Sequence, residues 1–184
     1  SSQGKLFISV AAGITTASML SRLPEATALV RCMPNTPALV KTGMTALFAS
    51  PAVTAEQRAS ATSVLSSVGE SLWVDTEAEL DIVTAVSGSG PAYFFLMMES
   101  LINAGVAEGL STEISTQLVL QTALGAAVMA KQSESDAGTL RKQVTSPGGT
   151  TQAAIEHFQS VKFEKAVGDA VNAARTRSVE LSKN

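Results

Sequence analysis

The segment from Leu118 to Ala130 restricts the possible folds more than any other part of the chain. Only Gln121 and Thr122 are polar in it, within a longer pattern that predicts a helix over 112–131. A surface helix keeps one polar side for water, so a helix that is apolar nearly all round must be buried on every side. The few helices predicted around it leave that burial incomplete, and we therefore expect a second copy of the chain to cover it.

The composition fits a globular protein and argues against several kinds of partner. Apolar residues make up 45% of the 184 residues and charged residues 16%, which argues against disorder. The formal net charge is −3 and the basic residues are scattered, so no nucleic-acid partner is expected. The longest apolar run, at 92–98, is much shorter than the roughly 20 residues that span a bilayer, so no membrane partner is expected.

The first part of the chain alternates predicted strands with predicted helices, which is typical of a layered α/β domain. A buried, parallel-type strand begins almost at the first residue, so we expect its neighbours to be missing and the chain to be a fragment. Thr54 and Gln57 predict a capping box at the start of one helix. The strands are expected at 6–10, 28–34, 44–50 and 70–75, and a short helix at 15–23.

After Asp75 the strand patterns stop and the apolar residues follow a helical period. Thr76 and Glu79 predict a second capping box at this change. The expected fold class is therefore the remnant of an α/β domain followed by an all-α domain, with the boundary at residue 76. The helices are expected at about 77–87, 91–109, 112–131, 136–144, 150–159 and 162–182.

The segment TSPGGTT at 145–151 precedes the pattern of a helix. Pro147 ends the helix before it, and Gly148 and Gly149 let the backbone come close to a ligand. The free N–H groups at the start of the next helix favour an anion. These features indicate a cradle for a carboxylate or a phosphate, but a plain turn with a Thr cap explains them equally well.

The segment TAVSGSGPAYFF at 84–95 places two glycines and a proline between two helical patterns and predicts a sharp break. It is no dinucleotide fingerprint, because Tyr93 occupies the third glycine position and no strand precedes it. Taken alone, close helix packing explains it better than a ligand site. The only histidine, His157, has no Cys or carboxylate cluster around it, so no metal site is expected.

The segment RCMPNTP at 31–37 follows a predicted strand. Ligands of open α/β sheets bind at the carboxyl ends of strands, where Asn35 and Thr36 offer hydrogen bonds to a cofactor. A plain Asn-Thr-Pro turn is the simpler interpretation of this segment alone. Cys32 cannot form an internal disulfide, because it is the only cysteine; this is compatible with a reducing compartment.

Four segments resemble, in this order, the pyrroline-5-carboxylate reductase family: SVAAG at 9–13, RCMPNTP at 31–37, VTAVSGSGPAY at 83–93 and LRKQVTSPGGTT at 140–151. The resemblance extends over essentially the whole chain. It implies that residues 1–76 are the C-terminal part of a Rossmann-like NAD(P)-binding domain. Residues 77–184 would then be a helical substrate-binding and dimerisation domain. The family's first strands and their Gly-rich fingerprint have no counterpart in this sequence.

The resemblance also implies a reaction, the reduction of 1-pyrroline-5-carboxylate to L-proline, the last step of proline biosynthesis. In the family the hydride comes from NADPH or NADH, and the protein aligns the two reactants. By the same resemblance, Thr84 is expected near the ring nitrogen of the substrate and Glu134 near its amine. The substrate carboxylate is expected at Val144, Ser146, Gly148, Gly149 and Thr151, and the nicotinamide end of the cofactor at Ala11, Ala12, Gly13, Met33, Pro34 and Asn35.

Members of the family interlock their helical domains into a homodimer, in some cases a larger homo-oligomer, and a cytoplasmic location is expected. Two other interpretations stay open. In the first, the chain is a catalytically incompetent module that only dimerises. In the second, it is another dehydrogenase with a Rossmann sheet and a helical domain, such as a β-hydroxyacid dehydrogenase relative. The latter usually carry a catalytic Lys in the helical domain, and no Lys lies between Lys41 and Lys131.

Overall fold

The computed structural model describes residues 4–182, which form two compact units. We call Ser1–Pro91 together with Asp169–Asn184 the sheet unit, and Ala92–Gly168 the helical unit. The expected domain boundary at residue 76 stays a prediction. By packing, the helical residues just after it and the last turns of the chain belong with the sheet.

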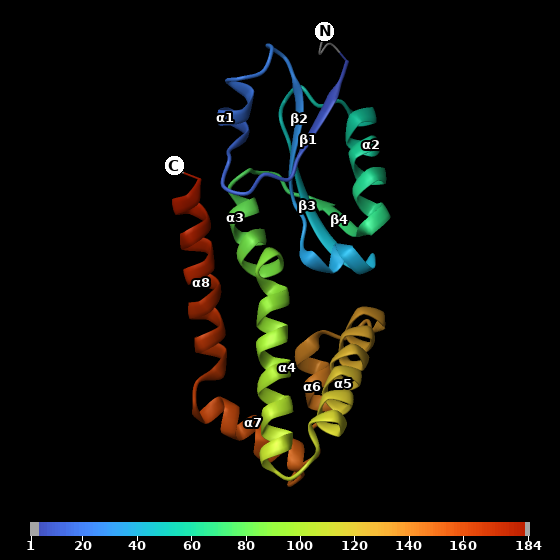
Figure 1. Ribbon diagram of the computed structural model, residues 1–184, viewed down its shortest axis with the longest axis vertical. Helices are drawn as coiled ribbons and strands as arrows, with labels where there is room; N and C mark the ends of the chain where they lie inside the picture. Colours follow the sequence, from blue (N-terminus) through green and yellow to red (C-terminus); the bar gives the residue numbers. More distant parts are fainter. Residues whose placement is uncertain (1–3, 183–184) are drawn as a thin grey trace. The chain divides into compact units, whose positions relative to one another are not determined.

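The sheet unit is built on a four-stranded mixed sheet in the order β1-β2-β3-β4 (Figure 1). β1 pairs with β2 in parallel, β2 with β3 antiparallel, and β3 with β4 in parallel. This sheet and the helices after it confirm the expected fold class, an α/β remnant followed by a mostly helical region. The strands are β1 (Leu6–Ser9), β2 (Ala28–Met33), β3 (Gly43–Ala49) and β4 (Gly69–Trp73).

All six residues of β2 are buried, whereas the four residues of β1 are only half-buried. β2 lies between two strands, and helices cover both of its faces. β1 lies at the edge of the sheet and pairs only with β2. The expectation that the first strand is buried was therefore wrong, although its parallel pairing was predicted correctly.

Helices cover the two faces of the sheet and form two small cores. On one face, Ala61 of α2 (Ala55–Leu65) packs with Val30 and Leu47. On the other face, Leu80 of α3 (Glu79–Val83) packs with Met33, and α1 (Thr16–Leu20) lies against β2 (Figure 1). Short 3₁₀ helices, η1 (Thr36–Val40) and η2 (Ser66–Val68), flank β3 and β4.

Cys32 of β2 belongs to the core on the α2 side. Its thiol donates a hydrogen bond to the Ser9 carbonyl oxygen at 3.2 Å. Burial away from water disfavours the thiolate and raises the pKa of Cys32 to about 11. The thiol therefore acts as a small apolar group that links β1 to β2, as expected for a free cysteine inside a core.

One of the two predicted capping boxes is present. The Thr54 hydroxyl accepts from the Gln57 backbone N–H at 3.2 Å, and the Gln57 side chain accepts from the Thr54 N–H at 3.0 Å. The second was wrong: α3 begins only at Glu79, whose carboxylate accepts from both the N–H and the hydroxyl of Thr76. The Glu79 N–H donates to the Thr76 carbonyl at 3.2 Å and not to the Thr76 hydroxyl, so only the Glu79 half of the box forms.

The sharp break predicted at 84–95 was also wrong. Thr84–Gly88 forms a single turn of π-helix, η3, and α4 (Gly90–Ala107) begins after Ser89. The Ser89 N–H donates to the Thr84 carbonyl at 2.8 Å, five residues back, so the turn absorbs an extra residue instead of ending the helix. The resulting stretch, Glu79–Ala107, is long and apolar enough to cross a membrane by length and composition alone. Core helices of other proteins meet the same criterion.

The helical unit contains most of α4 together with α5 (Thr112–Gln132), α6 (Ala137–Gln143), α7 (Thr150–Ser160) and the first turns of α8 (Phe163–Leu181). Among its residues, all of which the structure describes, only Ser115 is buried. Its hydroxyl donates to the Ile102 carbonyl at 2.9 Å, where Gly105 lets α4 and α5 approach closely. Large apolar side chains are exposed along α4 and α5, among them Phe94, Phe95, Leu96, Leu118, Leu124 and Met129.

Candidate functional site

In the sheet unit, the carboxyl end of β2 and the π-helical turn meet. Met33 is buried at the end of β2, and Thr84 opens the turn. A Cβ atom placed on Gly88 would lie 3.7 Å from both the Met33 sulfur and the Thr84 methyl group. Gly88 therefore faces both side chains across a small space. The structure thus brings together Met33 and Thr84, two residues expected to contact the reactants.

The Thr84 hydroxyl donates a hydrogen bond to the Leu80 carbonyl at 2.7 Å. Threonine in helices often bonds back to the preceding turn in this way. Because the hydroxyl proton is occupied, the lone pairs of this oxygen are the part that a ligand can use. The geometry favours Thr84 as an acceptor of a hydrogen bond over Thr84 as a proton donor.

Pro34 and Asn35 continue from β2, and the Asn35 side chain connects this end of the strand to two other segments. Its amide nitrogen donates to the Ser87 carbonyl at 3.2 Å and lies 3.3 Å from the Ser87 hydroxyl. Its amide oxygen accepts from the Met44 N–H at 2.8 Å. Sequence reasoning named Asn35 as a cofactor residue and did not find Ser87, whose position becomes meaningful only through this tertiary contact.

Ala11, Ala12 and Gly13 follow β1. The Ser9 hydroxyl accepts from the Ala11 N–H at 3.3 Å, and Gly13 adopts a left-handed φ of +72° beside the Leu181 backbone. Ala12 is exposed, and the other two are half-buried. This segment therefore forms a fixed turn with backbone open to a ligand.

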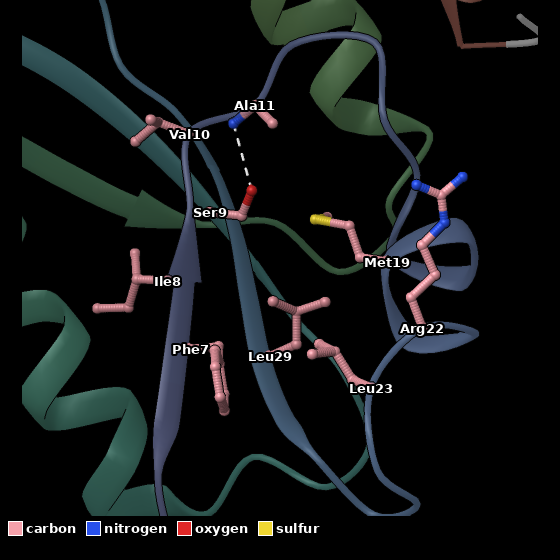
Figure 2. Close-up of a pocket in the computed structure, with 9 residues that line it drawn as sticks. All are labelled: Phe7, Ile8, Ser9, Val10, Ala11, Met19, Arg22, Leu23 and Leu29. Atoms are coloured by element: carbon pink, nitrogen blue, oxygen red, sulfur yellow. Dashed lines mark hydrogen bonds between the residues drawn. The ribbon is translucent and has the colours of Figure 1, made fainter. Parts of the chain in front are cut away.

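Ala11 also lines an open pocket of about 510 Å³ beside β1, shown in Figure 2. Phe7 and Leu29 lie in it on the α1 side of the strands, while Ile8 points to the opposite side. Met19 and Arg22 complete its wall near α1. The pocket is mainly apolar, with the Arg22 guanidinium as its charged group.

A buried ion pair that sequence reasoning missed fixes the same region. Arg31 is only 4% exposed, and its Nη1 lies 2.7 Å from Glu77 Oε1. The same oxygen accepts from the N–H and the hydroxyl of Thr16, at 2.6 and 2.9 Å. An arginine within an apolar strand was the available signal, because a buried charge requires a partner.

Glu77 stays ionised in this network. Burial alone would raise the pKa of its carboxyl, but the hydrogen bonds from Thr16 and Arg31 and the Arg31 charge outweigh burial. They lower the pKa of Glu77 below its ordinary value of 4.5. The carboxylate thereby joins the first turn of α1, which follows Gly13, to β2, which ends at Met33.

In the helical unit, the expected carboxylate loop connects α6 to α7. Gly148 has a left-handed φ of +69°, and its N–H donates to the Gln152 side chain at 2.7 Å. Gly149 is the N-cap of α7 and provides no side-chain cap for the first N–H groups of the helix. Val144, Ser146 and Thr151 are exposed around this turn. The structure brings these residues together in one loop that opens on a helix N-terminus.

Glu134 lies in the short connection between α5 and α6 and is exposed. Two residues later, Asp136 caps α6 by accepting from the Thr139 N–H at 2.7 Å. That hydrogen bond, with one from the Thr139 side chain, lowers the pKa of Asp136 below its ordinary value of 3.8. Asp136 therefore has a structural role as a helix cap. Glu134 is the other carboxylate of this connection.

Comparison with known proteins gives consistent results. The family model described as pyrroline-5-carboxylate reductase dimerisation matches residues 77–181. A pyrroline-5-carboxylate reductase from Pseudomonas aeruginosa is 53% identical over 97% of this chain, and one from Mycobacterium tuberculosis is 45% identical over 96%. The chain spans 66% and 65% of the lengths of these two relatives, slightly less than two thirds.

Solved structures agree with these relatives. A pyrroline-5-carboxylate reductase from Coxiella burnetii superposes with a TM-score of 0.94 at 44% identity, covering 97% of this chain and 66% of that one. The Plasmodium falciparum pyrroline carboxylate reductase, solved with NADP bound, gives 0.90 at 35% identity, covering 98% and 71%. Both superpositions include the sheet and the helices.

A Rossmann-like sheet followed by helices with uncovered apolar surfaces defines a class of two-part proteins whose helical part mediates dimerisation. Within that class, this chain belongs to the pyrroline-5-carboxylate reductase family.

Proposed function

We propose that this chain supplies the C-terminal two thirds of an enzyme that reduces 1-pyrroline-5-carboxylate to L-proline with NADPH or NADH. The observation that carries the proposal is the 53% identity to the Pseudomonas aeruginosa reductase, which extends over 97% of the chain. A cytoplasmic location and the domain division at residue 76 belong to the same proposal.

The residues of the sheet unit fit the nicotinamide end of such a cofactor. The space beside Gly88 is one that a Cβ atom would fill, and it lies between Met33 and Thr84. Ala11, Ala12 and Gly13 would offer backbone at the end of β1, with Pro34 and Asn35 at the end of β2. When bound, the cofactor supplies the hydride, and these residues align it.

Thr84 would hold the substrate by its ring nitrogen. A protonated imine carries an N–H. The Thr84 oxygen can accept a hydrogen bond from that N–H through its lone pairs, because the Thr84 hydroxyl proton is donated to the Leu80 carbonyl. Accepting that hydrogen bond favours the cationic, hydride-accepting form of the substrate. Glu134 would act in the same direction through its negative charge.

The loop of the helical unit would bind the substrate carboxylate. The first N–H groups of α7 have no side-chain cap, and the positive end of an 11-residue helix favours an anion. The Thr151 hydroxyl adds a donor, with Val144, Ser146, Gly148 and Gly149 shaping the turn. The Gly148 N–H donates to the Gln152 side chain at 2.7 Å, so a substrate carboxylate would have to displace that oxygen to use this N–H.

The partner is a second copy of the chain. The family match is described as a dimerisation region, and α4 and α5 expose apolar side chains that a dimer would bury. A chain that dimerises without catalysis is the competing function, and the same exposed helices support it. The two functions differ in turnover and not in association.

A chimera tests the proposal. The N-terminal third of the Pseudomonas aeruginosa relative is joined to this chain, and oxidation of NADPH and NADH is followed with 1-pyrroline-5-carboxylate. We expect turnover by the chimera and none by this chain alone. A dimeric chimera that oxidises neither cofactor would contradict the reductase function and leave only the dimerisation module.

Thr151→Val in the chimera tests the carboxylate loop. A hydrogen bond to a charged group contributes about 1.5–3 kcal/mol, so the KM for the substrate should rise roughly 10-fold to 150-fold. Thr42→Val makes the same change at an exposed position of the sheet unit and should leave KM within about twofold. An unchanged KM in Thr151→Val would exclude this residue from the cradle.

A further inference from the structure

The carbonyl of Ser87, in the π-helical turn, cannot receive the usual helical hydrogen bond. In an α-helix its donor would be the N–H four residues on, and that residue is Pro91, which has none. The Asn35 amide nitrogen donates to this carbonyl at 3.2 Å instead. A side chain from the end of β2 thus replaces the missing backbone donor of the turn.

Asn35 is itself held in place. Its amide oxygen accepts from the Met44 N–H at 2.8 Å, at the start of β3. Its nitrogen also lies 3.3 Å from the Ser87 hydroxyl. Both ends of the amide are therefore engaged by protein, and the side chain joins the sheet to the π-helical turn.

The turn that Asn35 supports carries Thr84. π-Helical turns interrupt the regular hydrogen-bond pattern and occur frequently at functional sites. The Thr84 carbonyl closes this turn by accepting from the Ser89 N–H at 2.8 Å, and the Thr84 methyl group faces the Gly88 position. Any relaxation of the turn at Ser87 would move Thr84 relative to Met33.

We propose that Asn35 is a positioning residue, whose side chain orients Thr84 by holding the Ser87 carbonyl of the π-helical turn and is not itself a ligand of the cofactor. This inference rests on the proposed function, because it assigns Thr84 a place beside the substrate. It adds a task for Asn35 and Ser87 that the role of a cofactor-bordering segment does not include. Catalytic geometry is sensitive to such shifts, since a displacement of about 1 Å lowers rates roughly 100-fold.

Two variants of Asn35 test the inference in the chimera. Asn35→Ala removes both connections, whereas Asn35→Asp keeps an oxygen for the Met44 N–H and loses the donor to Ser87. We expect kcat to fall about 10-fold to 100-fold in both, with the Kd for NADPH within about threefold. Asn172→Ala, the same change at an exposed position of α8, should leave kcat within about twofold. If Asn35→Ala fails to fold, the kcat and the Kd for NADPH of Asn35→Asp alone test the inference.

Hydrogen exchange in this chain gives a readout that needs no turnover. In both Asn35 variants, the amides of residues 84–90 should exchange about tenfold faster, with strands β2 and β3 unchanged. A Kd for NADPH raised more than about tenfold, with unchanged kcat and exchange, would overturn the inference and make Asn35 a cofactor ligand. Faster exchange throughout the sheet unit would overturn it as well, in favour of general destabilisation. An inactive unsubstituted chimera would contradict the proposed function alone, because the exchange comparison still tests the contact with Ser87.

Discussion

The sheet unit buries its apolar residues within the chain, whereas the helical unit leaves its own exposed. Val30, Leu47 and Leu80 of the sheet unit are at most 1% exposed. In the helical unit, which the structure describes throughout, Ser115 is the one buried residue, and Leu124 is 58% exposed. The first unit therefore has a hydrophobic core of its own, and the second needs a partner to complete one.

The largest expected effect is on association. Leu124→Asp places a charge on the apolar surface of α5, and a charge buried without a partner in an interface is costly. We expect the dimer to weaken by about 4 kcal/mol, roughly 1,000-fold. Light scattering over a range of protein concentrations measures it. Thr112→Asp adds the same charge at the first residue of α5 and should change association little. A Leu124→Asp dimer as tight as the unsubstituted one would show that α5 lies outside the interface.

The next effect concerns the core of the sheet unit. Leu47 of β3 is fully buried in the core on the α2 side of the sheet, so Leu47→Ala should lower the free energy of unfolding by about 3 kcal/mol. Leu39, on η1, is 89% exposed, and Leu39→Ala should cost less than about 0.5 kcal/mol. Urea denaturation followed by fluorescence of Trp73, the only tryptophan, reports on this unit. Equal costs for the two variants would mean that the sheet unit has no core of its own.

The sequence predicted local features of both units better than contacts between residues distant in the chain. Strands, the Thr54 cap and the apolar α5 were predictable because their patterns are local. The ion-pair partner of Arg31 could not be predicted, because Glu77 is distant in the sequence and contacts Arg31 only in the folded chain. The glycines and Pro91 predicted a break where a π-helical turn forms, since nothing local shows that Asn35 supplies the missing donor. The residues expected at the site stay predictions, and their clustering within each unit came from the structure.

Acid should weaken the sheet unit through Glu77. The pKa of Glu77 is lowered in the folded state, so its stabilising effect is present above its ordinary value of 4.5 and is lost as pH falls through the lowered value. Glu77→Gln should destabilise the sheet unit near neutral pH, because Arg31 stays buried without its charge partner. It should also flatten the loss of stability from about pH 5 to about pH 3.

Trp73 fluorescence in urea, repeated over that pH range, measures this effect. Glu180→Gln is the matched control, because Glu180 pairs with Arg177 on the surface of α8 with both side chains more than half exposed. Such a pair contributes little, so its removal should leave the pH dependence unchanged. Identical profiles for Glu77→Gln and the unsubstituted chain would show that the buried pair does not stabilise the sheet unit.

The smallest expected effect compares two helix caps, one in each unit. The Thr54 hydroxyl caps α2, and the Ser111 hydroxyl caps α5 by accepting from the Ile114 N–H at 3.2 Å. Replacing either by Ala should cost about 1 kcal/mol. For Thr54→Ala that cost should appear in the Trp73 transition and be independent of protein concentration. For Ser111→Ala the cost should appear as weaker association. A helical unit whose core is completed by a second copy has a stability that depends on the protein concentration. If Ser111→Ala shifted the Trp73 transition as much as Thr54→Ala, the two units would unfold together and would not be independent in stability.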